Sequence, residues 1–479
     1  MTDITSSFPT SLSYRIRTLI GNMSRVGVKI TPDRTTGIAP NDIITLKLPN
    51  SSLVDLRTFN FFYKFSTSGS TGTFLHPRYS SSLIERISIV VNGQTIDILP
   101  SYNFLYNVLM DMEGSSFDQF SKRNICEFFD PSLRFTSADP TSAADVAIVG
   151  ANWTTAGTSA PNKIDGAITH FLGFLGSCSP SVIDTSDLGD VFIQIQFASP
   201  YVLPSTIHGT AQTLAGASFT LDEVYATCDI ISFASDEYYQ LKASKLMSSG
   251  LNIGFYSYLN ARFASTTKNT GISVNWNVSA NSLDQIICTM CKTDQSSIWK
   301  PMLVYGSNGD GSTTFTMSQI VANPIGLVNN TGTTRTDVLG DGFMNSYYFL
   351  RNGQAVKESR VSINNRPINY SFLSPKEIFI QSLKALGYNH IDLGTNGLNA
   401  CIFSLAHFLK YYFVHIEDLT IQDNKDFWIS GLNSLGSTLT ITWDCNFSGS
   451  GNAQTCIPVM YARLSKILNV QQGRQIAVI

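Results

Sequence analysis

Alternation of apolar and polar residues is the sequence feature that most constrains the fold. Between residues 190 and 197 every second residue is apolar, with mostly polar residues between, and residues 438–447 repeat the pattern. Side chains alternate between the two faces of a β-strand, so both segments are predicted to be strands with one buried face. A chain dominated by this pattern buries its sheets face to face, which predicts an all-β sandwich architecture.

Further strands are predicted where short apolar or alternating runs lie between turn residues. They cover residues 42–48, 58–65, 87–99, 168–175, 219–231, 251–263, 272–278, 285–290, 346–350, 360–364, 401–415 and 457–467. Within residues 87–99, Asn92-Gly93 is predicted to form a tight hairpin turn.

Few helices are predicted. Ser374 and Glu377 form a capping box around Pro375, so a helix is expected to begin there and to end at Gly387. Residues 101–112 and 235–247 are the other two predicted helices, because each has apolar residues at helical spacing or a helix-start signal.

The same order of elements occurs twice. Each half contains a strand, a polar turn, an isoleucine and a helix, in the runs Arg86 to Ser101 and Arg360 to Ser374. Three strands follow each helix, and the last of them covers 219–231 or 457–467. This repeat predicts two consecutive eight-stranded antiparallel jelly-roll sandwiches with a few short helices. The predicted boundaries are an N-terminal arm (1–40), a first jelly roll (41–234), a connector helix (235–250), a second jelly roll (251–470) and a C-terminal tail (471–479).

The composition is low in charge. Only 14% of the 479 residues are charged and 43% are hydrophobic, with a formal net charge of −3, whereas about 25% is usual for charged residues in a soluble domain. This excludes a strongly basic nucleic-acid coat and makes disorder unlikely on compositional grounds. Unpaired charges are costly in a desolvated interface, so the composition indicates a subunit surrounded by copies of itself.

No targeting or membrane segment is predicted. No run reaches the roughly 18 apolar residues of a membrane-spanning helix, and the N-terminus lacks a basic region followed by an apolar one. Eight irregularly spaced cysteines argue against a disulfide framework. Folding in a reducing compartment is therefore expected.

Residues 85–109, ERISIVVNGQTIDILPSYNFLYNVL, combine a strand hairpin with a Tyr-Asn-x-Leu-Tyr helix. With the turns at Asn92-Gly93 and Asn364-Asn365, the chain resembles the double jelly-roll major capsid proteins of tailless icosahedral DNA viruses. The style is closest to that of polinton-like viruses and virophages, and the resemblance covers residues 42–470.

The resemblance implies a function. Members of this family form trimeric, pseudo-hexameric capsomers that tile an icosahedral shell, so the chain is expected to self-assemble into a virion capsid. The resemblance also implies penton and minor capsid proteins as partners. The chain is expected to be synthesised in the cytoplasm or nucleus of the host cell. Residues 138–163 and 306–334, which carry no periodicity, are expected to project outward as loops.

Catalytic and metal-binding motifs are scarce. The chain has neither a Gly-x-Ser-x-Gly elbow nor a phosphate-binding loop. His415 and Glu417 share a strand face, as a metal pair requires, but an exposed ion pair at a strand end is the favoured interpretation. Cys288 and Cys291 are expected on opposite faces of a strand, so buried packing is favoured over a redox or metal pair. We therefore predict no enzyme, no cofactor, no metal site and no small-molecule substrate.

The N-terminal arm is the one segment with a charge bias. Five basic residues face two acidic ones in the first 34 positions; the basic ones are Arg15, Arg17, Arg25, Lys29 and Arg34. A solvated tail is the simplest interpretation. The functional interpretation is an arm on the inner face of a shell, where these cations contact neighbours, an internal membrane or the phosphates of packaged genome.

A carbohydrate-binding or adhesin-like β-sandwich is the alternative function. It requires exposed aromatic side chains, for which Trp153 and Trp299 in or near loops are candidates. It also requires a secretion route, which the N-terminus does not show. A glycosidase with two carboxylates from distant strands is a third, weaker alternative.

Overall fold

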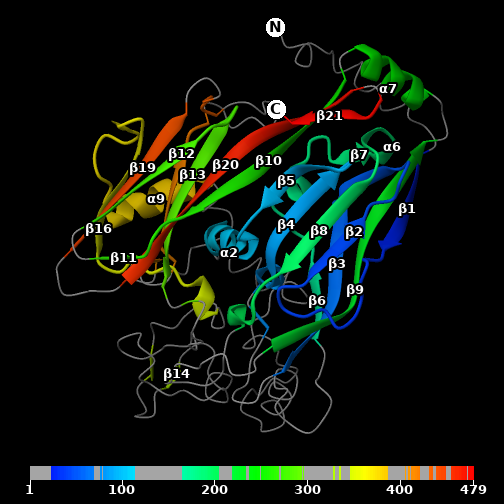
Figure 1. Ribbon diagram of the computed structural model, residues 1–479. Helices are drawn as coiled ribbons and strands as arrows, with labels where there is room; N and C mark the ends of the chain where they lie inside the picture. The colour runs from blue at the N-terminus through cyan, green and yellow to red at the C-terminus, as the bar shows by residue number, and fades with distance from the viewer. Residues whose placement is uncertain are drawn as a thin grey trace.

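Two β-sandwiches lie side by side in the computed structural model (Figure 1). The structure describes residues 23–68, 76–77, 79–113, 164–203, 218–233, 237–248, 250–268, 271–293, 295, 327–328, 334–335, 346–386, 405, 408–409, 412–420, 431–434, 438–448, 455–471 and 473–478. The predicted outward loops therefore lie outside the described residues, apart from positions 327–328 and 334.

The first sandwich, here called the first roll, is built from two facing sheets. One has the strand order β1 (Met23–Ile30), β9 (Ser218–Phe233), β3 (Leu53–Ser68) and β6 (Ile164–Ile168), with β7 (Val182–Asp184) also paired to β3. The other has the order β2 (Ile43–Lys47), β8 (Val191–Phe197), β4 (Ile84–Val91) and β5 (Gln94–Leu99).

The second roll has the same construction. One sheet has the order β10 (Leu251–Arg262), β20 (Thr455–Gln471), β13 (Leu283–Lys292) and β18 (Val414–Asp418), and β11 (Thr266–Thr267) and β21 (Gln475–Val478) also pair with β20. The other has the order β12 (Gly271–Val278), β19 (Leu439–Phe447), β16 (Val356–Ile363) and β17 (Arg366–Pro367). A short hairpin, β14 (Leu327–Val328) with β15 (Thr334–Arg335), lies apart from both rolls.

The strand order confirms the internal repeat. Eight strands correspond one to one: β1 with β10, β2 with β12, β3 with β13, β4 with β16, β5 with β17, β6 with β18, β8 with β19 and β9 with β20. Every one of these strands pairs with its sheet neighbours in antiparallel fashion. The fold is therefore two successive eight-stranded antiparallel jelly rolls, as predicted.

The apolar residues of the alternating strands form the buried core, as expected. On β8 the residues with odd numbers from Val191 to Phe197 are at most 1% exposed, and on β19 those from Leu439 to Phe447 are at most 7% exposed. Full burial of one such side chain contributes about 1.5–3 kcal/mol. The repeated apolar face therefore accounts for much of the stability of both sandwiches.

The two predicted hairpin turns are present. Asn92 and Gly93 both have positive φ angles, 48° and 80°, and they join β4 to β5. Asn364 and Asn365 have φ angles of 49° and 60° and join β16 to β17. Two left-handed residues give the type I′ geometry that matches the twist of a hairpin, and Asn and Gly tolerate it best.

Helices occupy the equivalent place in both rolls. α2 (Tyr102–Glu113) follows β5, and α9 (Pro375–Ala385) follows β17. The predicted capping box of α9 is present, since Ser374 N donates to Glu377 Oε2 at 2.7 Å. Short helices occur elsewhere in the described chain, at η1 (Ser80–Leu83), α5 (Phe174–Ser177), α6 (Thr185–Leu188), η3 (Pro200–Val202) and η4 (Tyr347–Phe349).

The connector helix is α7 (Glu237–Ser248), which lies between the rolls in the chain. Lys242 Nζ holds it to the first roll through Asp184 Oδ2 at 2.6 Å and Asp187 Oδ2 at 3.0 Å. Figure 1 shows α7 at one end of the sandwiches rather than between their faces.

Two strand predictions were wrong in part and a third was wrong entirely. Residues 168–175 leave the strand after Ile168, and α5 begins at Phe174, directly after Gly173 with its φ of 71°. Residues 346–350 contain η4 instead of a strand. Within the described part of residues 401–415, β18 begins at Val414, and Leu405, Phe408 and Leu409 are helical. These three residues have the i, i+3, i+4 spacing of a helix face. In a short, almost continuous apolar run, that spacing cannot be told from the pattern of a buried strand.

The predicted arm and tail both contain strands. Residues 23–30 of the arm form β1, which pairs with β9 over its full length. Residues 475–478 of the tail form β21, which pairs with β20. These terminal segments thus extend the sheets of the two rolls.

The rolls are joined through the edge of β10. Gly254 exchanges two backbone hydrogen bonds with Ser179 of the first roll, at 2.8 and 2.9 Å. Ser257 Oγ donates to Asp97 Oδ1 at 2.6 Å, and both side chains are buried. This contact combines β-pairing with a buried polar bond, so it fixes the position of one roll against the other.

A buried ion pair adds a second link. Arg351 Nη1 lies 3.0 Å from Asp111 Oδ2, and neither side chain is exposed. Arg351 precedes β16 in the second roll, whereas Asp111 belongs to α2 in the first roll. Separating such a pair in a dry interior is costly, which further holds the rolls together.

Candidate functional site at the N-terminal strand

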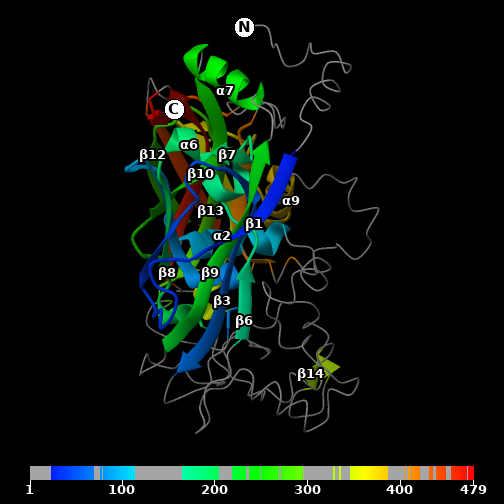
Figure 2. The same cartoon turned by 90° about the vertical axis from the view of Figure 1, so that its right-hand side faces the viewer.

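The N-terminal strand carries the described part of the predicted basic site. Arg25 and Lys29 lie on β1, and Arg34 follows it, whereas Arg15 and Arg17 lie outside the described residues. Figure 2 shows β1 on the face of the first roll that points away from the second roll. The structure therefore places three of the five predicted cations on one flank of the molecule.

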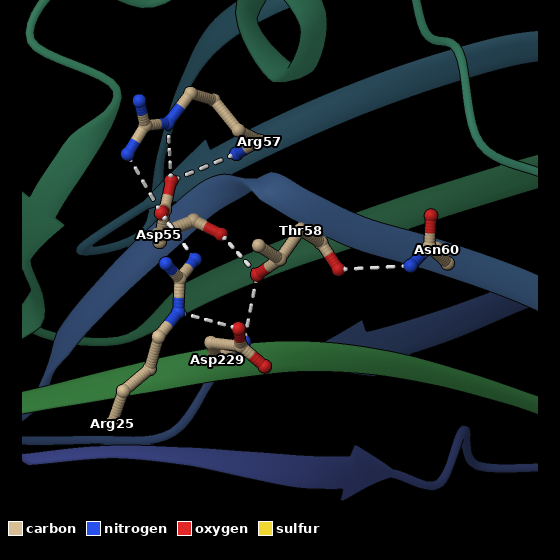
Figure 3. Close-up of polar contacts among 6 residues, drawn as sticks. All are labelled: Arg25, Asp55, Arg57, Thr58, Asn60 and Asp229. Carbon is tan, nitrogen blue, oxygen red and sulfur yellow. Dashed lines mark hydrogen bonds and ion pairs between the residues drawn. The ribbon is translucent and has the colours of Figure 1, made fainter.

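Arg25 binds two carboxylates of its own sheet (Figure 3). Its Nη2 lies 2.7 Å from Asp55 Oδ2, and its Nε lies 2.6 Å from Asp229 Oδ2. Asp55 is on β3 and Asp229 is on β9, so one guanidinium spans three strands. Arg25 thus holds β1 against the sheet in addition to the backbone ladder.

Asp55 is the centre of this cluster. Its side chain is fully buried, and Arg57 binds it from the side opposite Arg25, with Nε to Oδ1 and Nη2 to Oδ2 both at 2.9 Å (Figure 3). Hydrogen bonding from Arg57 lowers the pKa of Asp55 below its ordinary value, and the charge of Arg25 lowers it further against the effect of burial. The carboxylate is therefore ionised wherever the fold is intact above mildly acidic pH.

A bulge in β3 creates the space for the cluster. Asp55 pairs with Asp229, and Asn60 pairs with Thr227. Between these two pairs β3 advances by five residues while β9 advances by only two, so β3 bulges out of the ladder. Thr58 Oγ1 replaces part of the lost ladder, because it accepts from Asp229 N and donates to Asp55 O, both at 2.8 Å. The bulge turns Arg57 toward Asp55, as bulges commonly re-aim a side chain.

The other two cations are also held by their own chain. Lys29 Nζ lies 4.1 Å from the centre of the Tyr225 ring on β9, a cation–π contact. Arg34 is ion-paired with Asp42 and donates to Gly37 O at 2.5 Å. Among the residues that the structure describes, Lys29 has no carboxylate partner, so it keeps an uncompensated charge.

A second polar cluster lies inside the second roll. His415 Nε2 is 2.7 Å from Glu417 Oε1, and His415 Nδ1 is 2.9 Å from Ser359 Oγ. Trp443 Nε1 donates to the same Ser359 oxygen at 2.8 Å, and Gln381 of α9 donates to Glu417 Oε2 at 3.2 Å. The predicted sharing of one strand face is confirmed, but the predicted exposure of the ion pair was wrong.

Burial decides what this second cluster can do. Ser359, His415 and Glu417 have the residue types of an acyl-transfer relay, yet each is 0% exposed. α9 packs over β18 and covers them, which the sequence pattern did not reveal. Without access to solvent the cluster serves as a hydrogen-bonded core element.

The cysteine pair packs as predicted. Cys288 and Cys291 are both buried on β13, and burial raises the pKa of both thiols. Arg262 Nη2 donates to Cys291 Sγ at 3.3 Å. In the described part of the chain no three His, Cys, Asp or Glu side chains are grouped as a metal site would need, and no helix there is long and apolar enough to span a membrane. Trp153 and Trp299 lie outside the described residues.

Solved structures with the same fold are viral capsid proteins. The chain matches the quasi-atomic model of the PBCV-1 virus capsid at 11% identity, with a TM-score of 0.55 over 95% of this chain and 97% of that chain. It matches PBCV-1 VP54, fitted into a reconstruction of the virophage Sputnik, at 10% identity and a TM-score of 0.53 over 95% and 96%. The mavirus major capsid protein aligns at 9% identity and a TM-score of 0.50 over 100% and 95%.

These likenesses establish the fold. The chain is a double jelly-roll protein, and its fold extends over nearly the full length of the capsid proteins named above. No protein-family model matches the sequence, and no curated protein matches it.

Proposed function

We propose that this chain is a major capsid protein whose copies assemble into an icosahedral viral shell. The observation that carries the proposal is the repeated eight-strand order, which aligns with capsid proteins over 95% of the chain or more. The proposed mechanism is self-association through the flanks of the rolls, with no catalytic step.

The outer face of the second roll suits such association. Thr440 Oγ1 donates to Asn277 Oδ1 at 2.9 Å, and Thr442 Oγ1 donates to Asn275 Oδ1 at 2.8 Å, across β19 and β12. At these positions the face is polar and uncharged, whereas the next outward residue of β19, Asp444, is ion-paired with Arg360 of β16 at 3.3 Å. A neighbour that covers the Thr440–Thr442 end of the face therefore desolvates no ions there. Because its side chains already bond one another, little side-chain entropy is lost on association.

The proposal extends to the oligomeric state, the partners and the place of synthesis. Three copies form a capsomer with six rolls around its axis, and capsomers, penton proteins and minor capsid proteins complete the shell of a virion. Synthesis in the host cytoplasm or nucleus precedes assembly. The basic arm, with Arg15 and Arg17, contacts neighbours, an internal membrane or the genome on the inner face, and the chain has no enzymatic activity.

Mass photometry over a concentration series tests the proposal. The expected result is a species three times the 52.5 kDa chain mass, with three-lobed particles of pseudo-hexagonal outline in negative-stain microscopy. A chain that stays at 52.5 kDa at every concentration and ionic strength would contradict it.

A further inference from the structure

The internal repeat makes β1 and β10 equivalent strands. Each pairs on one side with the long last strand of its roll, in ladders that begin at Met23↔Phe233 and Leu251↔Val470. The outward backbone groups are those of Gly254 on β10, which bond Ser179, and those of Gly27 on β1, because Asp229, the ladder partner of Gly27, directs its N–H to β3. A contact made by the outer edge of one strand therefore has a defined counterpart on the other.

The outer edge of β10 is covered inside the chain. Gly254 N and O bond Ser179 of the first roll at 2.9 and 2.8 Å, and Tyr256 N donates to Ser177 Oγ at 2.8 Å. Phe255 packs edge to face on Phe174, with ring centres 5.1 Å apart. One roll thus completes the open sheet edge of the other.

The outer edge of β1 has no such cover from the described residues. β1 is the terminal strand of its sheet, and Met23 and Val26 are 54% and 61% exposed. Its eight-residue ladder to β9 is continuous, and the strand contains neither a proline nor a bulge. Natural edge strands are usually blunted by such features, because a regular free edge pairs with other chains.

The charged side chains of β1 lie over its own sheet rather than along its edge. Arg25 and Lys29 are the cations of β1, and both are drawn back onto their own sheet, Arg25 by Asp55 and Asp229 and Lys29 by the Tyr225 ring. The strand therefore presents backbone groups and Val26 on its outer side.

We propose that the outer edge of β1 is completed by the second roll of another copy of this chain, in the kind of edge contact by which the first roll completes β10. The inference rests on the proposed capsid function, whose contact surface it names. Figure 1 places β1 at one end of the molecule and the second roll at the other. The contact is therefore head to tail, and a head-to-tail contact closes into a ring when its rotation permits.

Photo-crosslinking identifies the occupant of the edge. p-Benzoylphenylalanine replaces Val26 in a chain of normal isotopic composition, which is co-assembled with ¹⁵N-labelled wild-type chain and irradiated. The expected product joins Val26 of the light chain to a heavy peptide from residues 251–470. Adducts confined to light peptides from residues 1–22, or to heavy peptides from residues 23–233, would overturn the proposal.

A backbone variant provides an independent readout. Asp229 N donates to Thr58 of β3 and so points away from β1, which leaves the N–H of its ladder partner Gly27 pointing outward. Gly27→Pro therefore removes an edge donor and leaves the ladder bonds to β9 intact. We expect its assembly midpoint to rise at least tenfold in concentration, while Gly27→Ala, which keeps the N–H and adds only an ordinary contact, assembles as wild type does. Wild-type assembly by Gly27→Pro would count against the edge contact, and if that variant does not fold, the crosslink decides.

The two proposals fail differently. Wild-type chain that never leaves the monomeric state refutes the capsid function and the edge contact together. Wild-type chain that forms capsomers, but crosslinks through Val26 to its own N-terminal residues or to another first roll, refutes the edge contact alone.

Discussion

At the scale of single residues, the basic N-terminal segment proves to be tied into the fold. Arg25 forms ion pairs with Asp55 and Asp229, and Arg34 forms an ion pair with Asp42. The sequence showed that these cations were clustered, but their partners lie up to 204 residues away. Only the folded sheet brings them together, so sequence reasoning could predict the positive charge of the segment and not its compensation.

The first prediction concerns the centre of that cluster. Asp55→Asn removes the charge that two guanidinium groups share in a buried position, and we expect a loss of about 1–3 kcal/mol in the free energy of unfolding. Urea denaturation measures it. The matched control is Asp190→Asn, because Asp190 forms an exposed pair with Lys47 and such pairs contribute little. Equal effects of the two substitutions would contradict the role given to Asp55.

The second prediction is the pH dependence of the same contact. The folded pKa of Asp55 lies below its ordinary value of 3.8, so its stabilising effect is present above about pH 4 and is lost as the pH falls through the folded pKa. The stability difference between wild type and Asp55→Asn should therefore be constant from pH 7 to 5 and shrink toward pH 3. Unfolding midpoints of both proteins at each pH test this; a difference that grows on acidification would refute it.

At the scale of elements, the strands with one buried face were the ones that the sequence predicted. The alternating strands β8 and β19 were predicted because one face of each is buried. β1 was missed although Val26, Val28 and Ile30 alternate with Gly27 and Lys29, because that run is short and its basic residues favoured a solvated tail. Seven of its eight residues are in fact not buried. The repeat itself held the missing signal, since a strand predicted at residues 251–263 opens the second unit and the first unit lacked its counterpart.

The third prediction addresses the hairpin between β4 and β5. Gly93 has a φ of 80° and open space around the position of a Cβ atom, so Gly93→Ala tests backbone strain without a steric clash. We expect a cost of about 1–2 kcal/mol, measured by thermal unfolding. Gly27→Ala is the control, because Gly27 lies in a strand with ordinary φ and its Cβ would make only normal contacts. That substitution should be neutral or slightly stabilising.

At the scale of the whole molecule, the junction between the rolls depends on polar groups that are removed from water. Asp97 is buried there, where Ser257 Oγ and Phe174 N donate to its carboxylate. Burial raises the pKa of Asp97, and these hydrogen bonds offset part of the rise. The two rolls thus meet around a carboxylate whose ionised form is disfavoured.

The fourth prediction follows from that environment. A raised pKa means that Asp97 contributes most below its ordinary value of 3.8 and loses that contribution as the pH rises through the folded pKa. Asp97→Asn removes the charge and can keep both bonds, with Oδ1 accepting from Phe174 N and Nδ2 donating to Ser257 Oγ. We expect the variant to be at least as stable as wild type at pH 7 and relatively less stable at pH 4, by chemical denaturation. The opposite order would show that the junction prefers the ionised carboxylate.

The pairing of the first and last strands of each roll has a consequence for synthesis on the ribosome. β1 finds its ladder partner only when β9 emerges, some two hundred residues after Met23, which at about 5–20 residues per second is roughly 10–40 s of translation. In the same way, β10 can pair with β20 only after β20 has been translated. Each roll is therefore closed in a single late step, and the first is complete while the second is still being translated.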